Sequence, residues 1–232
     1  MAEDFERILG HDYRDALSTD EQRSQLKEAT DFDRFAPNGT PDNATANTYN
    51  PAVNGYQEEG LQWGETGWGP IDDTSPLRKY PEYVPTDEAI RTLVDIGPLL
   101  EVGAGNGYWT HTINENGGDC VATDLYPRDS TDDEENTIWA DVREYDAVDA
   151  IAEYPERVVF MCHPSGADRW SERVLDAISE QTFVFVGEWF PGMDANPWFF
   201  VRLSRHWNLL DDFPVYNWES THAHGYVFER SK

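Results

Sequence analysis

The chain has 232 residues, 39% of them hydrophobic, and a formal net charge of −28 from 45 acidic and 17 basic side chains. This length allows one α/β domain with a sizeable core and an extension. The strong negative charge disfavours nucleic-acid binding, and neither a leader-like segment nor an 18-residue apolar run is present. We therefore expect a soluble, cytoplasmic protein without a membrane partner.

The acidic excess is spread over both halves of the chain, and lysine occurs only at Lys27, Lys79 and Lys232. In molar salt the Debye length falls to roughly 3 Å, which screens the repulsion between such charges. This composition favours a protein of an extreme halophile, with an ordinary acidic protein as the alternative.

Residues 1–80 are expected to form an N-terminal extension that wraps the domain or covers its pocket. Apolar side chains recur at helical spacing over 2–30, whereas 36–60 are rich in Asn, Thr, Pro and Gly, as loops are. The domain itself is expected over 81–232. Its first helix begins after Thr86, whose hydroxyl can cap it, and ends before Gly97-Pro98.

From this point strands and helices alternate, which is typical of a doubly wound α/β sheet. We predict strands at 99–103, 119–124, 137–140, 157–162 and 182–187. We predict helices at 107–116, 143–153, 167–179 and 195–206. No helical pattern separates the last two strands, 209–216 and 223–229, so they should form an antiparallel hairpin.

The most informative segment, residues 101–107, reads Glu-Val-Gly-Ala-Gly-Asn-Gly after an apolar run. It predicts a strand that ends in a tight turn and opens a helix, leaving room for a ligand against bare backbone. A dinucleotide fingerprint has its third glycine where this chain has Tyr108. A carboxylate at Glu101 would repel a diphosphate but can hold an ammonium group. The pattern therefore favours a zwitterionic ligand, with NAD or FAD as the alternative.

Residues 101–109 resemble the first motif of class I methyltransferases that depend on S-adenosylmethionine (SAM). The resemblance implies SAM as the cofactor and a Rossmann-like methyltransferase fold, a seven-stranded sheet of order 3-2-1-4-5-7-6 with strand 7 antiparallel. It also implies which residues contact SAM. The methionine part would be contacted by Glu101, Gly103, Gly105 and Asn106. The ribose would be contacted by Asp124, and the adenine by Asp141 and Val142. Asp141 is alternatively the N-cap of the helix that follows it.

A narrower resemblance extends over roughly residues 80–230. Segments 83–86, 101–109, 158–164 and 186–188 are similar to an uncharacterised group of bacterial and fungal methyltransferase-like proteins. This similarity implies the same fold and leaves the substrate open.

Reacting groups of an open α/β sheet gather beyond the carboxyl ends of its strands. His163, after the fourth expected strand, could be a general base or a structural histidine bonded to a loop carbonyl. Glu188, after the fifth, could orient a substrate amine or hydroxyl, pair with His163, or cap a helix. After the fourth strand, methyltransferases that act on adenine or cytosine amines carry the motif Asp/Asn/Ser-Pro-Pro-aromatic. This chain has His-Pro-Ser-Gly there, at residues 163–166, and so departs from that motif.

His222 and His224 have no third ligand nearby in the sequence, so no metal site is expected. Cys120 and Cys162 lie in apolar runs and are interpreted as buried thiols. The predicted function is transfer of a methyl group from SAM to an O or N atom of a small molecule. The alternatives are a SAM-binding or degenerate domain that acts in assembly without catalysis, and a nucleic-acid methyltransferase.

Overall fold

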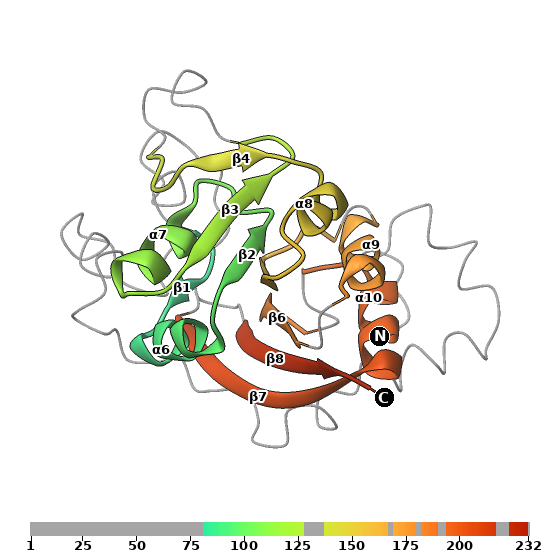
Figure 1. Ribbon diagram of the computed structural model, residues 1–232. Coiled ribbons are helices and arrows are strands. Elements are labelled where there is room, and N and C mark those ends of the chain that lie inside the picture. The colour runs from blue at the N-terminus through green and yellow to red at the C-terminus, as the bar shows by residue number, and fades with distance from the viewer. Residues whose placement is uncertain are drawn as a thin grey trace, which may run out of the picture.

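The computed structural model describes residues 81–127, 137–166, 169–179, 182–189, 194–216 and 223–231. They form one mixed sheet with helices on both of its faces (Figure 1). The expected extension, residues 1–80, lies outside the described residues.

The sheet contains eight strands in the order β1-β7-β8-β6-β5-β2-β3-β4. Their bounds are β1 (Val84–Pro85), β2 (Leu99–Val102), β3 (Cys120–Asp124), β4 (Val142–Glu144), β5 (Val158–Cys162), β6 (Thr182–Gly187), β7 (Trp207–Tyr216) and β8 (His224–Arg230). Strands β2 to β6 are mutually parallel, and β8 is antiparallel to both β6 and β7. The chain winds outward from β2 through β3 and β4, and then from β5 in the opposite direction. This places a topological switch point between β2 and β5.

The expected order of seven strands is incomplete, because the structure adds the two-residue strand β1. Val84 and Pro85 pair with Tyr216 and Val215 of β7 and extend the sheet beyond that strand. The antiparallel orientation of the last strand is confirmed. A strand of two residues shows no alternation of apolar and polar side chains, so no sequence pattern indicated it.

The prediction of a strand at 137–140 is wrong. The strand that follows β3 along the chain is β4, and it begins at Val142. The helix expected from 143 begins at 147, with Asp146 and not Asp141 as its N-cap. The cause is a tertiary contact. The backbone N–H of Trp139 donates to the carbonyl of Asn106, 2.9 Å away, so this segment lies against the glycine turn.

The described helices cover both faces of the sheet (Figure 1). Helices α6 (Asp87–Ile96) and α7 (Tyr108–Glu115) lie on one face. Helices α8 (Ala147–Glu153), α9 (Trp170–Ala177) and α10 (Pro197–His206) lie on the other. As expected, the Thr86 side chain caps α6, accepting from the N–H of Ala89 at 3.1 Å. The Thr86 hydroxyl also donates to the carbonyl of Pro214 and so ties α6 to β7.

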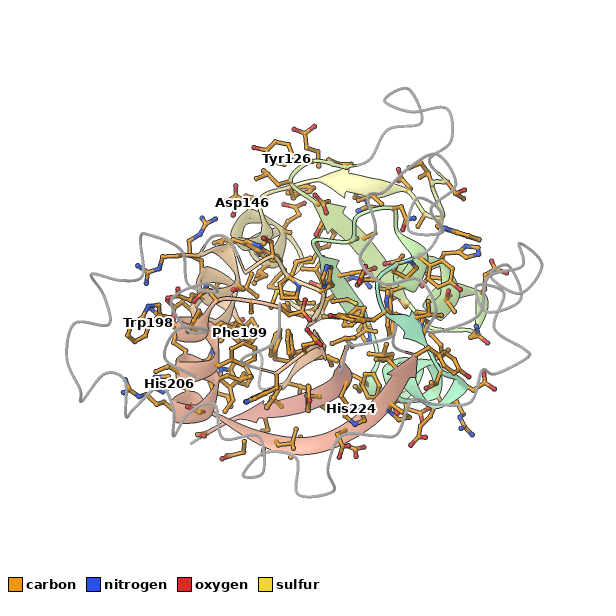
Figure 2. The ribbon with its side chains drawn as sticks, turned by 180° about the vertical axis from the view of Figure 1, so that it is seen from behind. Tyr126, Asp146, Trp198, Phe199, His206 and His224 are labelled. Carbon is orange, nitrogen blue, oxygen red and sulfur yellow. The ribbon has the colours of Figure 1, made fainter. Side chains whose placement is uncertain are left out.

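Each face has its own apolar core. Aromatic rings dominate the core beneath α8 to α10, where Phe183, Phe185, Phe199 and Phe228 are fully buried. In Figure 2 the adjacent Trp198 and Phe199 point to opposite sides of α10, and only Phe199 belongs to the buried core. On the other face Trp109 packs on Phe160, with ring centroids 5.3 Å apart. Burial of these rings, with the aliphatic side chains around them, stabilises the sheet.

Cys120 and Cys162 are free thiols; Cys120 is buried as expected, whereas Cys162 is half-buried. Within the described ranges, no helix combines the length and apolar character needed to cross a membrane.

Gly107 provides a test of the contact between the glycine turn and residues 139–142. Its φ is +78°, and an added Cβ would lie 2.8 Å from the Cβ of Ala140. Gly117 has a φ of +89° and open space around it. We expect Gly117→Ala to lower the free energy of unfolding by about 1–2 kcal/mol through backbone strain alone. Gly107→Ala should cost about 1–3 kcal/mol more through overpacking. Denaturant unfolding in molar salt measures both variants, and equal losses would contradict the packing described.

Candidate functional site

The predicted site residues come together along one edge of the sheet. Gly103 follows β2, Asp124 ends β3, His163 follows β5 and Glu188 follows β6. The strand registers align these positions. Val102 pairs with Thr123, the residue before Asp124. Cys162, the residue before His163, pairs with Val186, two residues before Glu188. Because neighbouring strands lie about 5 Å apart, the four residues form a row. His163 and Gly103 stand on either side of the switch point, where ligands of such sheets bind.

The turn between β2 and α7 has open space above its backbone at Gly105. Gly103 and Gly105 have φ values of +74° and +57°, a left-handed conformation that glycine adopts without strain. An added Cβ on Gly105 would meet nothing within 4 Å. One on Gly103 would lie 3.1 Å from Cη2 of Trp170, the first residue of α9. A ligand can therefore approach this turn at Gly105, beside the indole ring of Trp170.

Asp124 holds one side of this turn. Its Oδ2 accepts from the N–H of Gly105 and its Oδ1 from the N–H of Tyr126, both at 2.9 Å. A carboxylate accepts about four hydrogen bonds, so two more can be accommodated. Leu125 and Tyr126, which follow it, are 45% and 81% exposed, and Figure 2 shows Tyr126 at the periphery of the molecule. Asp124 thus combines hydrogen-bonding capacity with adjacent exposed apolar surface.

Glu101 holds the other side of the turn. Its side chain is buried, and its Oε2 accepts from the backbone N–H of Thr110 at 3.0 Å and from the Thr110 hydroxyl at 2.5 Å. Thr110 lies in the first turn of α7, where Gly107 offers no capping side chain. Glu101 therefore stabilises the start of the helix. Burial raises the pKa of Glu101 to about 7; the hydrogen bonds from Thr110 oppose this rise and the Asp124 charge adds to it.

The other predicted cofactor residues lie beside the same turn. Asn106 is buried, and its Oδ1 accepts from the N–H of Tyr108 at 3.3 Å. Asp141 is exposed and stands directly before β4, whereas the prediction had it follow a strand. Val142 begins β4, and its Cγ2 would lie 3.1 Å from a Cβ on Gly107. Contacts of these three residues with a ligand stay predictions.

His163 has an acidic partner that the sequence did not reveal. Its Nδ1 lies 2.5 Å from Oδ1 of Asp194, whose side chain is fully buried. Pairing with Glu188 was one of the alternatives for His163, and at Nδ1 Asp194 takes that place. His163 has a φ of +50°, in the left-handed region that is strained for a non-glycine residue. Its ring also meets Tyr83 edge-on, with centroids 5.2 Å apart.

The surroundings of His163 favour its charged form. Burial lowers the pKa of His163, but the hydrogen bond and charge of Asp194, with the charges of Glu82 and Glu188, outweigh burial and raise it above its ordinary value. Burial raises the pKa of Glu82, and the charges of Asp194 and Glu188 raise it further, while His163 lowers it. The site is thus a histidine among several carboxylates.

Sequence reasoning missed three residues of this site. Tyr83 lies in the segment 83–86 that carried the narrower resemblance, which was the only signal for it. Asp194 precedes Asn196, the N-cap of α10, in a chain where acidic residues are common. Trp170 begins α9 and gave no pattern beyond that of an apolar helix residue.

The remaining expectations concern residues at the margin of the site. His224 pairs with Asp212, Nε2 to Oδ2, at 2.6 Å, and His222 lies outside the described residues. In the part of the chain that the structure describes, no three His, Cys, Asp or Glu side chains are arranged to hold a metal ion.

No protein-family model matches the chain, and no curated protein matches it in sequence. Among solved structures, a protein of the NADB-Rossmann superfamily from Streptococcus agalactiae is similar at 14% identity, over 64% of this chain and 70% of that chain, with a TM-score of 0.43. Magnesium protoporphyrin IX methyltransferase from Synechocystis PCC 6803, solved with bound SAM, is similar at 8% identity, over 61% and 76%, with a TM-score of 0.42. Ribosomal protein L11 methylase from Lactobacillus delbrueckii subsp. bulgaricus is similar at 12%, over 62% and 77%, with a TM-score of 0.40. At such low scores the function has to be argued from the site.

The raised pKa of Glu101 gives a pH dependence of stability. The folded chain keeps this proton up to about pH 7, whereas the unfolded carboxyl loses it near its ordinary pKa of 4.5. The stabilisation is therefore complete below pH 4.5 and is lost as the pH rises to about 7, by roughly 3 kcal/mol.

We expect the unfolding free energy of the wild type, relative to that of Glu101→Gln, to fall across this range. The subtraction removes the effect of the other carboxylates, which both proteins share. Denaturant unfolding at a series of pH values measures it, and a difference independent of pH would contradict the burial of an ionisable Glu101.

Proposed function

We propose that the chain is a SAM-dependent methyltransferase that moves a methyl group to an O or N atom of a small molecule. The observation that carries this proposal is the bare glycine turn at the switch point, open at Gly105. Asp124 lies on one side of this turn and His163 on the other. A ligand-binding edge with a hydrogen-bond acceptor at one end and a histidine at the other suits a nucleoside cofactor beside a reacting group.

The residues of the turn fit SAM chemically. The two remaining acceptor positions of Asp124 suit the two ribose hydroxyls, and the exposed apolar surface of Leu125 and Tyr126 suits a purine ring. The hydrogen bonds of Glu101 described above are both on Oε2, and we assign Oε1 to the ammonium group, directly or through water. The proposed cofactor contacts are Glu101, Gly103, Gly105, Asn106, Asp124, Asp141 and Val142.

Bound SAM supplies an electrophilic methyl group on a sulfonium, so alignment of the acceptor and exclusion of water provide most of the rate. We assign His163 as the general base that takes the proton of an acceptor hydroxyl or amine. Its side chain is 39% exposed, which allows an acceptor to reach it. Glu188, next along the edge, is assigned to orienting the acceptor.

The charges around His163 bear on the class of acceptor. Glu82, Glu188 and Asp194 act on His163 electrostatically, so this end of the site carries a negative potential. A phosphate would be repelled here, and the net charge of −28 adds to that repulsion at low salt. These features favour a neutral or cationic small molecule over a nucleic acid. The cytoplasmic location and the halophilic origin stay predictions.

The direct test is transfer of a labelled methyl group from SAM to small molecules of a halophile lysate, at molar salt. We expect Asp124→Ala to weaken SAM binding by about 10–100-fold, the effect of losing hydrogen bonds to a charged group. Glu144→Ala removes an exposed carboxylate at the register position opposite Asp124 and serves as the matched control. Calorimetry measures binding. Equal affinities of the two variants would contradict the ribose contact, and binding without transfer to any acceptor would indicate a non-catalytic SAM-binding domain.

Gly105 allows strain to be separated from ligand contact. Gly105→Ala and Gly117→Ala both place an alanine at positive φ in open space, so each should lose about 1–2 kcal/mol of stability. Only the methyl group added at Gly105 would project beside the proposed cofactor. We expect at least about tenfold weaker SAM binding for Gly105→Ala and wild-type affinity for Gly117→Ala. The same affinity in both variants would place the cofactor elsewhere.

A further inference from the structure

Asp194 connects three segments that lie far apart in the sequence. Its side chain is fully buried, and its two oxygens have different partners. Oδ2 accepts from the Tyr83 hydroxyl at 2.8 Å and from the backbone N–H of Glu188 at 2.5 Å, whereas Oδ1 faces Nδ1 of His163 at 2.5 Å. An isolated antiparallel β-bridge between the backbones of Asp194 and Ser165 fixes the two loops relative to one another. The carboxylate therefore has little freedom to turn.

This arrangement decides which nitrogen of His163 carries the proton. A backbone N–H can only donate, so Oδ2 must remain directed at Glu188 and Tyr83. Oδ1 lies 2.5 Å from Nδ1 as an ion pair, and two lone pairs would repel at this distance, so Nδ1 holds a proton. In the neutral ring the lone pair then belongs to Nε2.

We propose that Asp194 is a positioning residue that keeps His163 in the tautomer with Nδ1 protonated, so that Nε2 receives the proton of the methyl acceptor. The proposal rests on the proposed function and extends it to a residue that does not touch the acceptor. The bond from the acceptor O or N to hydrogen breaks, the Nε2–H bond forms, and the electron pair stays on the acceptor atom. The imidazolium that results is stabilised by the adjacent carboxylate and returns its proton to solvent.

Among the described residues, three carboxylates act on the ring of His163. Glu82 precedes β1, Glu188 follows β6 and Asp194 precedes α10. All three favour the imidazolium, and only Asp194 is placed to fix the tautomer. Loss of the Glu82 charge should therefore lower the pKa of His163 and leave the tautomer unchanged.

The experiment is nitrogen NMR of the full chain labelled in its histidine rings, at molar salt and without cofactor, with His163→Gln assigning the His163 signals. In Asp194→Asn the amide oxygen must stay with the N–H of Glu188, so the amide NH₂ turns toward Nδ1. We expect the wild type to carry the proton on Nδ1 and Asp194→Asn to carry it on Nε2, with a lower pKa. Methyl transfer by this variant should fall about 10²–10⁴-fold. Glu82→Gln is the matched control and should keep the wild-type tautomer.

An unchanged tautomer and titration in Asp194→Asn would overturn the inference, even if the wild type transfers methyl groups. A reversed tautomer in a chain that transfers no methyl group would uphold the positioning role and reject the proposed function. If Asp194→Asn does not fold, Tyr83→Phe gives the second test. It removes one donor from Oδ2 and concentrates the negative charge, so the pKa of His163 should rise with the proton still on Nδ1. An unaltered titration in Tyr83→Phe would contradict the network.

Discussion

Two carboxylates on neighbouring strands determine the shape of the turn between β2 and α7. The glycines of this turn have no side chains with which to hold it, so Asp124 bonds to its middle and Glu101 to the helix that follows. Each acid satisfies backbone N–H groups that would otherwise lack partners at a helix start or a tight turn. The residues proposed to bind the cofactor therefore also hold the turn in place, and cofactor binding should stabilise the fold by mass action.

The part of the site around His163 is built on a third acid, Asp194, on the opposite side of the switch point. A buried carboxylate is costly unless it is paired, and Asp194 accepts two hydrogen bonds on Oδ2 while its Oδ1 forms an ion pair with His163. These three partners belong to segments before β1, after β5 and after β6, so this network forms only when the sheet is assembled. The short strand β1 thereby gains a role, since it brings Tyr83 to the site.

The parts of this account that the sequence predicted are those with a local signal. The apolar strands, the cap at Thr86 and the glycine turn each follow from neighbouring residues, and α6 and β6 end where expected. Strand β4 shifted because the contact of Trp139 with the glycine turn overrides the local pattern. Asp194 and Tyr83 are 111 residues apart, and no single-sequence pattern reports a pair at that separation.

The central claim is that a nucleoside cofactor lies across the bare turn, with Asp124 at one end and His163 at the other. A crystal structure with S-adenosylhomocysteine tests it most directly. We predict ribose hydroxyls on the Asp124 carboxylate, ligand atoms against the backbone of Gly105, and the sulfur on the side of His163. Ligand bound at any other place on the molecule, or a turn blocked by the indole of Trp170 at saturating ligand, would contradict it.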